Sequence, residues 1–433
     1  MDESLWLDAN KAPYFREGDL YYPSDLLSHE NLDHYTPGGF HPIMIGDEFS
    51  HGRYRIIHKL GYGGFSTTWL ARDQHKNILV ALKALRASAS GEADTVDDII
   101  RDVVIPQNIH SALPTSDLIR PLYDSFVVEG PNGLHRILIH PFAGPSIHSI
   151  LMESLDERVK LRGDLARKLA KQMAMALYDM HRLGFVHGDL TTSNILFRVI
   201  DPILGWSDAE VYHYLGDSLT LEVKTTSGDP CGPHVPRELV EPVDHLRFFE
   251  QTLLLQESIV VIDFGQSYEV ASPPKNYRPG TKMNYTSPEA LYDNRAGMEA
   301  DVWALGCAIY EIRTGYHLFT MFAGDRDEIL GEIFRTLGKP PDAWWKTEGE
   351  GWTEPTRPCP IHKRVSLAAR GIYDAPVYVE DGLHPLPITE VPEVRMDEKE
   401  VDLLTDLLEK MIRYRPEERI TMEEVISHPW FNM

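Results

Sequence analysis

The sequence has few cysteines, no long apolar run and no surplus of positive charge, and each absence excludes a class of protein. Its 433 residues include only Cys231, Cys307 and Cys359. None of the three lies at metal-ligand spacing, and an odd number fits a reducing compartment. No apolar run approaches the roughly 18 residues that span a bilayer. The first residues, MDESLWLDAN, carry no signal-peptide pattern. We therefore expect a soluble protein of the cytoplasm or nucleus, without a membrane partner.

The charge balance is strongly acidic, with 66 Asp and Glu against 42 Lys and Arg and a net charge of −24. Phosphate backbones are bound by Lys and Arg, so this balance argues against nonspecific binding of nucleic acid. It favours basic partners, although an acidic surface also serves solubility alone. We expect basic protein partners, no direct contact with nucleic acid, and a monomer.

The first half of the chain changes character near Tyr54. Residues 1–53 are rich in Asp, Glu, Pro, Tyr and His and show little periodicity, which indicates an irregular extension. Three β-type runs follow, YRIIHKL (54–60), TTWLARD (67–73) and ILVALKAL (78–85), joined by short polar turns. This pattern predicts an antiparallel meander.

The second half is dominated by helical patterns. Leucine and methionine recur at helical spacing over residues 158–183, and Gly184 ends that run. Residues 299–313 are apolar nearly all round, which predicts a helix buried in a core. The final helices, VDLLTDLLEKMI and TMEEVISHPW, are amphipathic. A segment punctuated by Pro and Gly, at about residues 199–256, is interpreted as an insertion on the surface.

A glycine-rich stretch and a lysine lie among the predicted strands. GYGGFSTT (61–68) follows one strand and opens the next, and Gly61 and Gly63 would let backbone amides close over phosphates. Lys83 ends VALK on the following strand and could reach inward to the same phosphates. Glycines between strands usually make only a turn, and a strand lysine is usually solvated, so each signal alone is weak.

Acidic and amide side chains gather in two later motifs. In HGDLTTSN (187–194), Asp189 would accept the proton of an attacking hydroxyl and Asn194 would bind Mg²⁺. Asp263 follows an apolar run in VVIDFG and would be the second Mg²⁺ ligand, since Mg²⁺ needs few carboxylates beside phosphate oxygens. Asp102 is the candidate to hold Lys83, although Pro106 should bend or end its helix.

These motifs, taken in their order along the chain, resemble those of the eukaryotic protein kinases over about residues 54–431. SPEAL (287–291), DVWALGC (301–307) and RPEERIT (415–421) are similar to three motifs of the kinase C-terminal lobe. The resemblance implies an α+β, bilobal fold with a small antiparallel β-sheet lobe at about 54–143. A larger, mostly helical lobe is implied at about 144–431.

The resemblance also implies roles for individual residues. Glu289 would pair with Arg419, and Asp301 would brace the backbone of the catalytic loop. Asp189, Lys83 and Asn194 would be catalytic, and ATP and Mg²⁺ would be the cofactors. The ATP contacts would be Leu60, Gly61, Gly63, Gly64, Phe65, Ser66, Thr68, Ala81, Lys83, Pro141, Ala143 and Leu196.

Within the kinases, the chain is most similar to the SR-protein kinases and their fungal relatives. The lead-in PGGFHPIMIGDEFSHGRYRIIHKLGYGGFSTTWLARD and the long insertion before D-F-G carry this likeness. Gly188 and Thr191 depart from the kinase pattern, where Arg and Lys usually stand. Thr286 replaces an Arg common in the wider group, and Arg335 aligns with an acid of the substrate-docking groove.

The resemblance implies transfer of the ATP γ-phosphate to Ser or Thr of Arg/Ser-rich proteins of the splicing type. Gly188 cannot hold a phosphate, so activity should not need phosphorylation of the segment after D-F-G. Two alternatives stay open. HGDLxxxN is also similar to small-molecule kinases of the aminoglycoside and choline type, and a pseudokinase would bind nucleotide or partners without chemistry.

Overall fold

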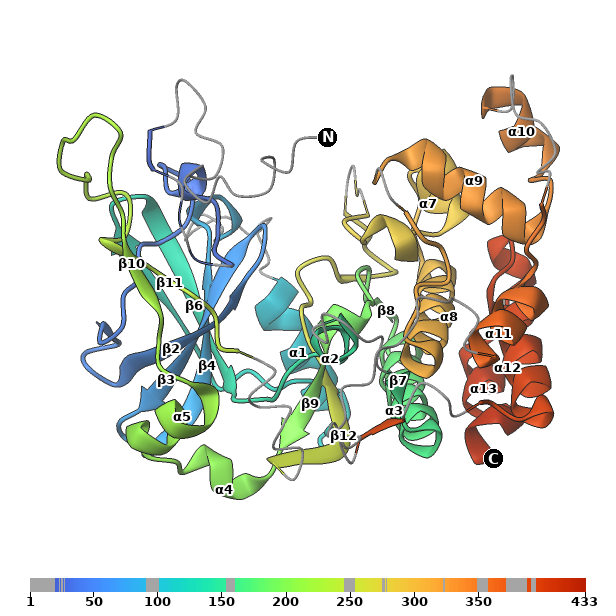
Figure 1. The fold of residues 1–433 in the computed structure, drawn as a ribbon, viewed down its shortest axis with the longest axis horizontal. Coiled ribbons are helices and arrows are strands. Elements are labelled where there is room, and N and C mark those ends of the chain that lie inside the picture. Colours follow the sequence, from blue (N-terminus) through green and yellow to red (C-terminus); the bar gives the residue numbers. More distant parts are fainter. Residues whose placement is uncertain are drawn as a thin grey trace, which may run out of the picture. The chain divides into compact units, whose positions relative to one another are not determined.

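The computed structural model forms two compact units, each assembled from separate stretches of the chain (Figure 1). Unit 1 comprises residues 1–100, 122–142 and 201–244, and unit 2 comprises the remainder. The structure describes residues 20–22, 24, 26, 28–90, 101–152, 160–244, 254–274, 277, 279–321, 324–348, 357–370, 388–390 and 395–433.

Unit 1 is built on a six-stranded antiparallel sheet with the order β1-β2-β3-β4-β6-β5. The three sequence runs predicted as strands form β2, β3 and β4, which confirms the meander. Trp69 and Leu82 on this sheet are buried together with Ile137, because alternate side chains of each strand face the same side. The strands are β1 (Glu48–Phe49), β2 (Tyr54–Tyr62), β3 (Ser66–Asp73), β4 (Ile78–Leu85), β5 (Asp124–Gly130) and β6 (Gly133–Pro141).

The part of the insertion that belongs to unit 1 is ordered and shares a core with the N-terminal segment. Its elements are α4 (Asp201–Leu204), α5 (Asp208–Leu215) and the hairpin of β10 (Thr220–Glu222) with β11 (Glu238–Val240). Apolar side chains from the two regions form one buried cluster, made of Leu32, Tyr35, Phe40, Val223, Val235 and Leu239. The segment interpreted as a surface insertion therefore contributes a few buried side chains to this cluster, and its interpretation as an insertion stays a prediction at this point.

Buried ionic contacts join the same regions to the sheet. Lys59 of β2 forms an ion pair with Glu30 of the N-terminal segment, and the two side chains are 0% and 2% exposed. Lys59 also donates to the carbonyl oxygen of Val240 in β11 at 3.0 Å. Asp208, at the start of α5, forms ion pairs with Arg55 of β2 and Arg72 of β3. A buried charge is tolerated only when it is paired, so these contacts fix both segments on the sheet.

Unit 2 is mainly helical and includes the two helices that the sequence predicted most clearly. α3 spans Gly163–Arg182, and α8 spans Met298–Thr314, with every residue of α8 from Asp301 onward buried. Gly315 ends α8 in the left-handed conformation, with a φ angle of 74°. The other helices are α1 (Arg101–Ala112), α2 (Ile147–Met152), α7 (Pro288–Asp293), α9 (Arg326–Leu337), α10 (Asp342–Glu348), α11 (Ile361–Ala369), α12 (Glu398–Met411) and α13 (Met422–Ile426).

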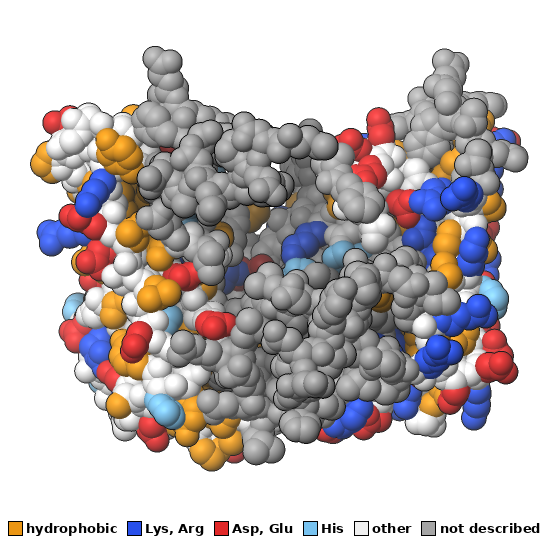
Figure 2. All heavy atoms as spheres, viewed as in Figure 1, with side chains coloured by type: hydrophobic (Ala, Val, Ile, Leu, Met, Phe, Trp, Pro, Cys, Tyr) orange, Lys and Arg blue, Asp and Glu red, His pale blue; other side chains and the backbone are white. Residues whose placement is uncertain are grey.

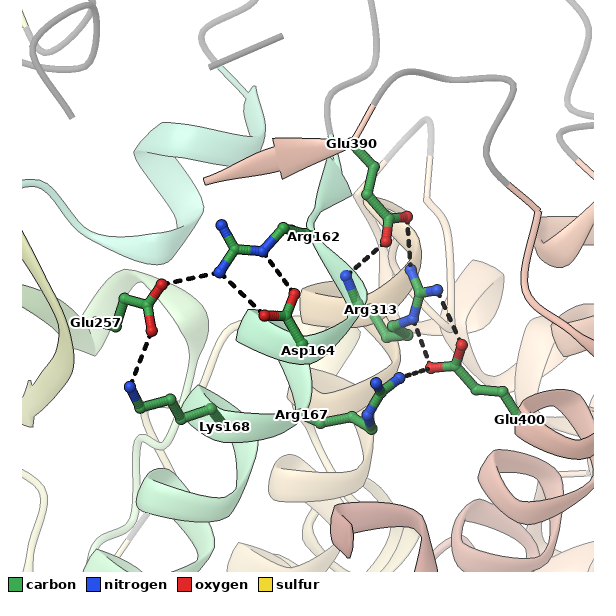
Figure 3. A network of polar contacts seen from close by, with 9 residues as sticks. Arg162, Asp164, Arg167, Lys168, Glu257, Arg313, Glu390 and Glu400 are labelled. Carbon is green, nitrogen blue, oxygen red and sulfur yellow. Dashed lines mark hydrogen bonds and ion pairs between the residues drawn. The ribbon is translucent and has the colours of Figure 1, made fainter. Parts of the chain in front are cut away.

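Short strand pairs and a polar network connect these helices. β9 (Ile195–Val199) pairs with β12 (Leu255–Val261), β8 (Phe185–Val186) with β13 (Tyr268–Glu269), and β7 (Lys160–Leu161) with β14 (Thr389–Glu390). Figure 3 shows Arg313 of α8 between Glu390 and Glu400, with Arg167 of α3 bound to the same Glu400. One carboxylate of α12 thus binds two other helices of the core.

The described part of the chain contains no helix that is both long and apolar enough to cross a membrane.

Candidate active site

The loop HGDLTTSN begins directly after β8, and one buried carboxylate holds its backbone. Asp301 of α8 accepts hydrogen bonds from the main-chain N–H of His187 at 2.7 Å and of Gly188 at 2.9 Å. Asp301 is 2% exposed, and its low-dielectric surroundings strengthen these charge-assisted bonds. The expected bracing of this loop by Asp301 is confirmed.

Asp189 lies in this loop as a half-buried residue whose carboxylate accepts a hydrogen bond on one oxygen only. The side-chain amide of Asn194 donates to its Oδ2 at 3.0 Å and to its main-chain carbonyl at 2.8 Å. Its Oδ1 is buried and accepts no hydrogen bond. Burial, and next the negative charge of Asp263, raise the pKa of Asp189 to about 7, against the lowering effect of Asn194. A carboxyl that titrates near neutral pH suits a group that accepts a proton during reaction.

Asp263 is brought to Asn194 by the pairing of β12 with β9. Val261 lies opposite Ile195, and the next N–H, that of Ile262, donates to the carbonyl oxygen of Asn194 at 3.0 Å. Asp263 itself adopts a φ angle of 66°, a conformation that is uncommon for a residue with a side chain. Such backbone is found mainly where the surrounding structure imposes it at functional sites. The structure therefore places both proposed metal ligands beside Asp189.

These ligands fit Mg²⁺ better than a metal that needs a full protein cage. Among the described residues, no cluster of three or more His, Cys, Asp and Glu side chains could hold a metal ion. Mg²⁺ is commonly held by one or two protein oxygens together with phosphate oxygens and water. Asn194 donates through its Nδ2, which leaves its amide oxygen, with the Asp263 carboxylate, as suitable donors.

Asp102 lies near the start of α1 and binds the D-F-G backbone. Its Oδ1 accepts a hydrogen bond from the N–H of Phe264 at 2.7 Å, and the residue is 8% exposed. Its pairing with Lys83 remains a prediction. Pro106 was expected to bend or end this helix, and it does not end it, because α1 continues to Ala112. A proline inside a helix removes one hydrogen bond, which the packing of this buried residue offsets.

Glycine is the residue type that fits at position 188 of the loop. Its φ angle is 79°, and an added Cβ would lie 2.5 Å from the Tyr277 hydroxyl and 2.6 Å from the Gln266 carbonyl oxygen. Tyr277 donates to that carbonyl oxygen at 3.2 Å, and Thr281 donates to the carbonyl oxygen of Gly188 at 2.8 Å. The Thr281 hydroxyl thus joins the segment after D-F-G to the loop, and the Tyr277 hydroxyl forms a hydrogen bond within that segment. The sequence signalled this only through the missing Arg at position 188.

Thr192 makes a second contact that stabilises the loop and that was not predicted from the sequence. Thr192 shares hydrogen bonds with Glu311 of α8 at 3.1 Å and with the Tyr285 hydroxyl at 2.9 Å. Glu311 is fully buried, and although burial opposes its charge, hydrogen bonds from His148 and His317 bring its pKa below the usual value. A charged Glu311 therefore joins the loop to the segment that ends at Tyr285.

The proposed nucleotide-binding residues of unit 1 lie in one row across the sheet. Gly61 of β2 is the register partner of Thr68 in β3, and Thr68 is the partner of Lys83 in β4. The turn between β2 and β3 is closed by a hydrogen bond from the Gly63 N–H to the Ser66 carbonyl oxygen at 2.9 Å. The sheet therefore brings the glycine-rich turn and the lysine together.

The glycines of this turn are not explained by protein packing. A Cβ at Gly61, Gly63 or Gly64 would meet no atom within 4 Å. None of the three has a positive φ angle. Neither side-chain space nor backbone conformation therefore requires glycine there, and the phosphate contact of these glycines stays a prediction. Phe65 at the tip is 65% exposed.

The remaining predicted nucleotide contacts have different environments. Leu60 lies in β2 before the turn, and Ala81 of β4 is fully buried. Pro141 ends β6 and is the register partner of Val80. In unit 2, Ala143 precedes Gly144, whose N–H donates to the carbonyl oxygen of Phe197 at 2.8 Å, and Leu196 forms a bridge with Ser146.

The C-terminal motifs form the contact that was expected of them. Arg419 donates to the two carboxylate oxygens of Glu289 at 2.7 Å and 2.6 Å, and both residues are less than a tenth exposed. This bidentate pair fixes α7, which follows the segment that carries Thr281 and Tyr285. The predicted pair of Glu289 with Arg419 is confirmed.

Comparison with known proteins gives the same result as the geometry. The protein kinase domain family matches residues 54–203 and 250–431. The chain is 25% identical over 424 residues to the serine/threonine-protein kinase SRPK of Physarum polycephalum, covering 95% of this chain and 92% of that protein. It is 27% identical over 386 residues to the protein kinase dsk1 of Schizosaccharomyces pombe, covering 71% and 70%. Human SRSF protein kinase 3 is 31% identical over 197 residues, covering 45% and 34%.

The family match covers more than half of the chain, and its gap coincides with α5 and the β10–β11 hairpin. The predicted α+β kinase fold is confirmed by this match together with the antiparallel sheet of unit 1 and the helices of unit 2. The chain therefore belongs to the protein kinase family, and it is a serine/threonine-protein kinase similar to the SR-protein kinases.

Proposed function

We propose that this kinase uses ATP and Mg²⁺ to phosphorylate Ser or Thr in basic, Arg/Ser-rich proteins of the cytoplasm or nucleus. The convergence of Asp189, Asn194 and Asp263 in unit 2 carries this proposal. Asn194 donates to Asp189 through its side chain, and its carbonyl oxygen accepts from the residue before Asp263. Asp189 and Asn194 thus lie in one loop, and a backbone hydrogen bond joins that loop to the residue before Asp263. The names of the relatives support the substrate class.

In the proposed reaction, each residue has a separate task. Asp189 orients the substrate hydroxyl and accepts its proton as the oxygen bonds to the γ-phosphorus, while the bond from that phosphorus to ADP breaks. Asn194 and Asp263 would hold Mg²⁺, which supplies neutralising charge to the phosphate oxygens. Lys83 and the amides of the glycine-rich turn would bind the phosphates from unit 1.

The test is transfer of labelled phosphate from ATP to an Arg/Ser-repeat peptide, with an acidic Ser peptide and choline as alternative acceptors. We expect transfer to the basic peptide that is abolished in Asp189→Asn and Asp263→Ala, with thermal unfolding close to that of the parent protein. Transfer to choline alone would support a small-molecule kinase. Nucleotide binding without any transfer would support a pseudokinase.

A further inference from the structure

The catalytic loop lacks a positive charge of its own. Between Asp189 and Asn194 the sequence reads Leu-Thr-Thr-Ser, and Thr191 stands where related kinases carry Lys. Thr191 is 1% exposed, and its hydroxyl is buried without a hydrogen-bond partner. Nothing in the loop itself can therefore neutralise the charge that develops on a phosphoryl group during transfer.

A cation from another segment lies against this loop. The ammonium group of Lys282 donates to the hydroxyl of Ser193 at 2.8 Å. Lys282 is exposed, and it forms no ion pair with any carboxylate in the part of the chain that the structure describes. Ser193 directly precedes Asn194, whose side-chain amide donates to the Asp189 carboxylate at 3.0 Å. The ammonium group is thus close to the reacting centre and is not neutralised by a neighbour.

The backbone on both sides of Lys282 is fixed. Before it, the Thr281 hydroxyl donates to the carbonyl oxygen of Gly188 at 2.8 Å. After it, the hydroxyl of Thr286 and the N–H of Tyr285 donate to the carbonyl oxygen of Lys282, at 3.0 Å and 2.9 Å. Position 282 is therefore held against the catalytic loop by contacts that do not involve its own side chain. A substitution there removes the charge without releasing the segment.

We propose that Lys282 supplies, from the segment after D-F-G, the positive charge beside Asp189 that the catalytic loop lacks at Thr191. This inference rests on the proposed function. As the substrate oxygen bonds to the γ-phosphorus and ADP leaves with the bridging oxygen, the ammonium group stabilises the equatorial phosphoryl oxygens and the hydroxyl proton passes to Asp189. The charge acts on the transition state, so its loss lowers kcat more than it raises KM.

Substitutions at two neighbouring positions separate the charge from the hydrogen bond. Lys282→Gln removes the charge and should lower kcat about tenfold to a hundredfold, the effect of one charge-assisted contact, with KM for ATP and peptide nearly constant. Lys282→Arg keeps the charge and should retain most of kcat. Ser193→Ala keeps the charge but removes the hydrogen bond, so it should lose far less than Lys282→Gln.

A double variant that moves the positive charge from position 282 to the catalytic loop tests the inference most directly. In the double variant Ser193→Lys, Lys282→Gln, a lysine lies on the loop beside the former ammonium site, and we expect kcat to recover by at least half of the loss on a logarithmic scale. The matched control is Lys399→Gln, because Lys399 is exposed on α12 and its side chain has no polar partner among the residues that the structure describes, so kcat should not change. Thermal unfolding of each variant identifies any loss of fold.

The outcomes are distinct. An unchanged kcat in Lys282→Gln overturns the inference while leaving the kinase function intact. A raised peptide KM with constant kcat also overturns it, because Lys282 would then bind substrate only. If the parent protein transfers no phosphate to any acceptor, the proposed function itself fails, and that result is seen before any variant is compared.

Discussion

At the scale of single residues, Gly188 shows how a departure from a family pattern can be a structural requirement. Related kinases with Arg at this position use it to hold a phosphorylated segment. Here the same space is filled by the Tyr277 hydroxyl and the Gln266 carbonyl oxygen. Thr281 and Tyr277 donate hydrogen bonds directly, so the segment is held without a phosphate.

We expect Gly188→Ala to lower both stability and kcat, and Gly188→Arg to lower them further rather than to restore a family-like enzyme. A left-handed residue with a Cβ costs about 1–2 kcal/mol, and the contacts at 2.5 Å and 2.6 Å add to this cost. Thermal unfolding and phosphate transfer measure the two effects.

Gly184→Ala is the matched control for this prediction. Gly184 has a φ angle of 84°, yet its Cβ would meet no atom within 4 Å. It therefore carries the same backbone cost without the contact. Equal losses in Gly184→Ala and Gly188→Ala would show that the contact with Tyr277 and Gln266 has no effect of its own.

At the scale of elements, Glu400 joins three helices of unit 2. This residue of α12 binds Arg313 of α8 through both carboxylate oxygens, at 2.7 Å and 3.0 Å, and Arg167 of α3 at 2.9 Å (Figure 3). Arg313 is 2% exposed, and its second partner, Glu390, lies at 3.3 Å. Removal of Glu400 would leave a buried guanidinium with one weaker partner.

We expect Glu400→Ala to lower the free energy of unfolding by about 3 kcal/mol, the low end of the range for breaking a buried ion pair. Glu398→Ala is the control, since Glu398 is exposed in the same first turn of α12 and shares its interaction with the helix dipole. Denaturant unfolding measures both. A difference below about 1 kcal/mol between the two variants would mean that Glu390 alone satisfies Arg313.

The elements that the sequence predicted are those with a strong local pattern of apolar residues. α3 buries leucine and methionine at helical spacing, and α8, which is apolar nearly all round, is buried at every residue from Asp301 onward. Asp189, Asn194 and Asp263 could be predicted because each lies in a local motif. Tyr277, Lys282 and Glu30 could not, since their roles depend on contacts between segments far apart in sequence. Lys59 and Glu30 form a buried pair across 29 positions, and no local pattern marks such a pair.

At the scale of the whole molecule, the net charge is −24, and some of the acidic side chains are paired with basic ones. On the face shown in Figure 2, acidic and basic side chains of the described residues are interspersed. The acidic side chains of α9 are partly paired with basic ones in the same way. Glu332 pairs with Arg335 at 2.5 Å and Arg364 at 2.8 Å, so its charge is neutralised. Asp325 is the N-cap of α9 and accepts from the N–H of Glu328.

Asp327 and Glu328 in the first turn of α9 could attract a basic substrate, although acids are also favoured at a helix start for the helix itself. The two roles respond differently to salt. Attraction of a basic peptide by exposed charges weakens when the Debye length falls to about 8 Å at physiological ionic strength, and KM then rises, whereas acids that only stabilise their own helix do not change KM. KM for an Arg/Ser peptide should therefore rise several-fold between low and physiological salt. At low salt it should rise likewise in the double variant Asp327→Asn, Glu328→Gln, with kcat nearly constant because the contact is the same in ground and transition states.

The control Asp402→Asn, Glu409→Gln removes the same charge from the exposed face of α12. Equal KM values in the two double variants would show that only net charge matters and that the start of α9 does not bind the substrate.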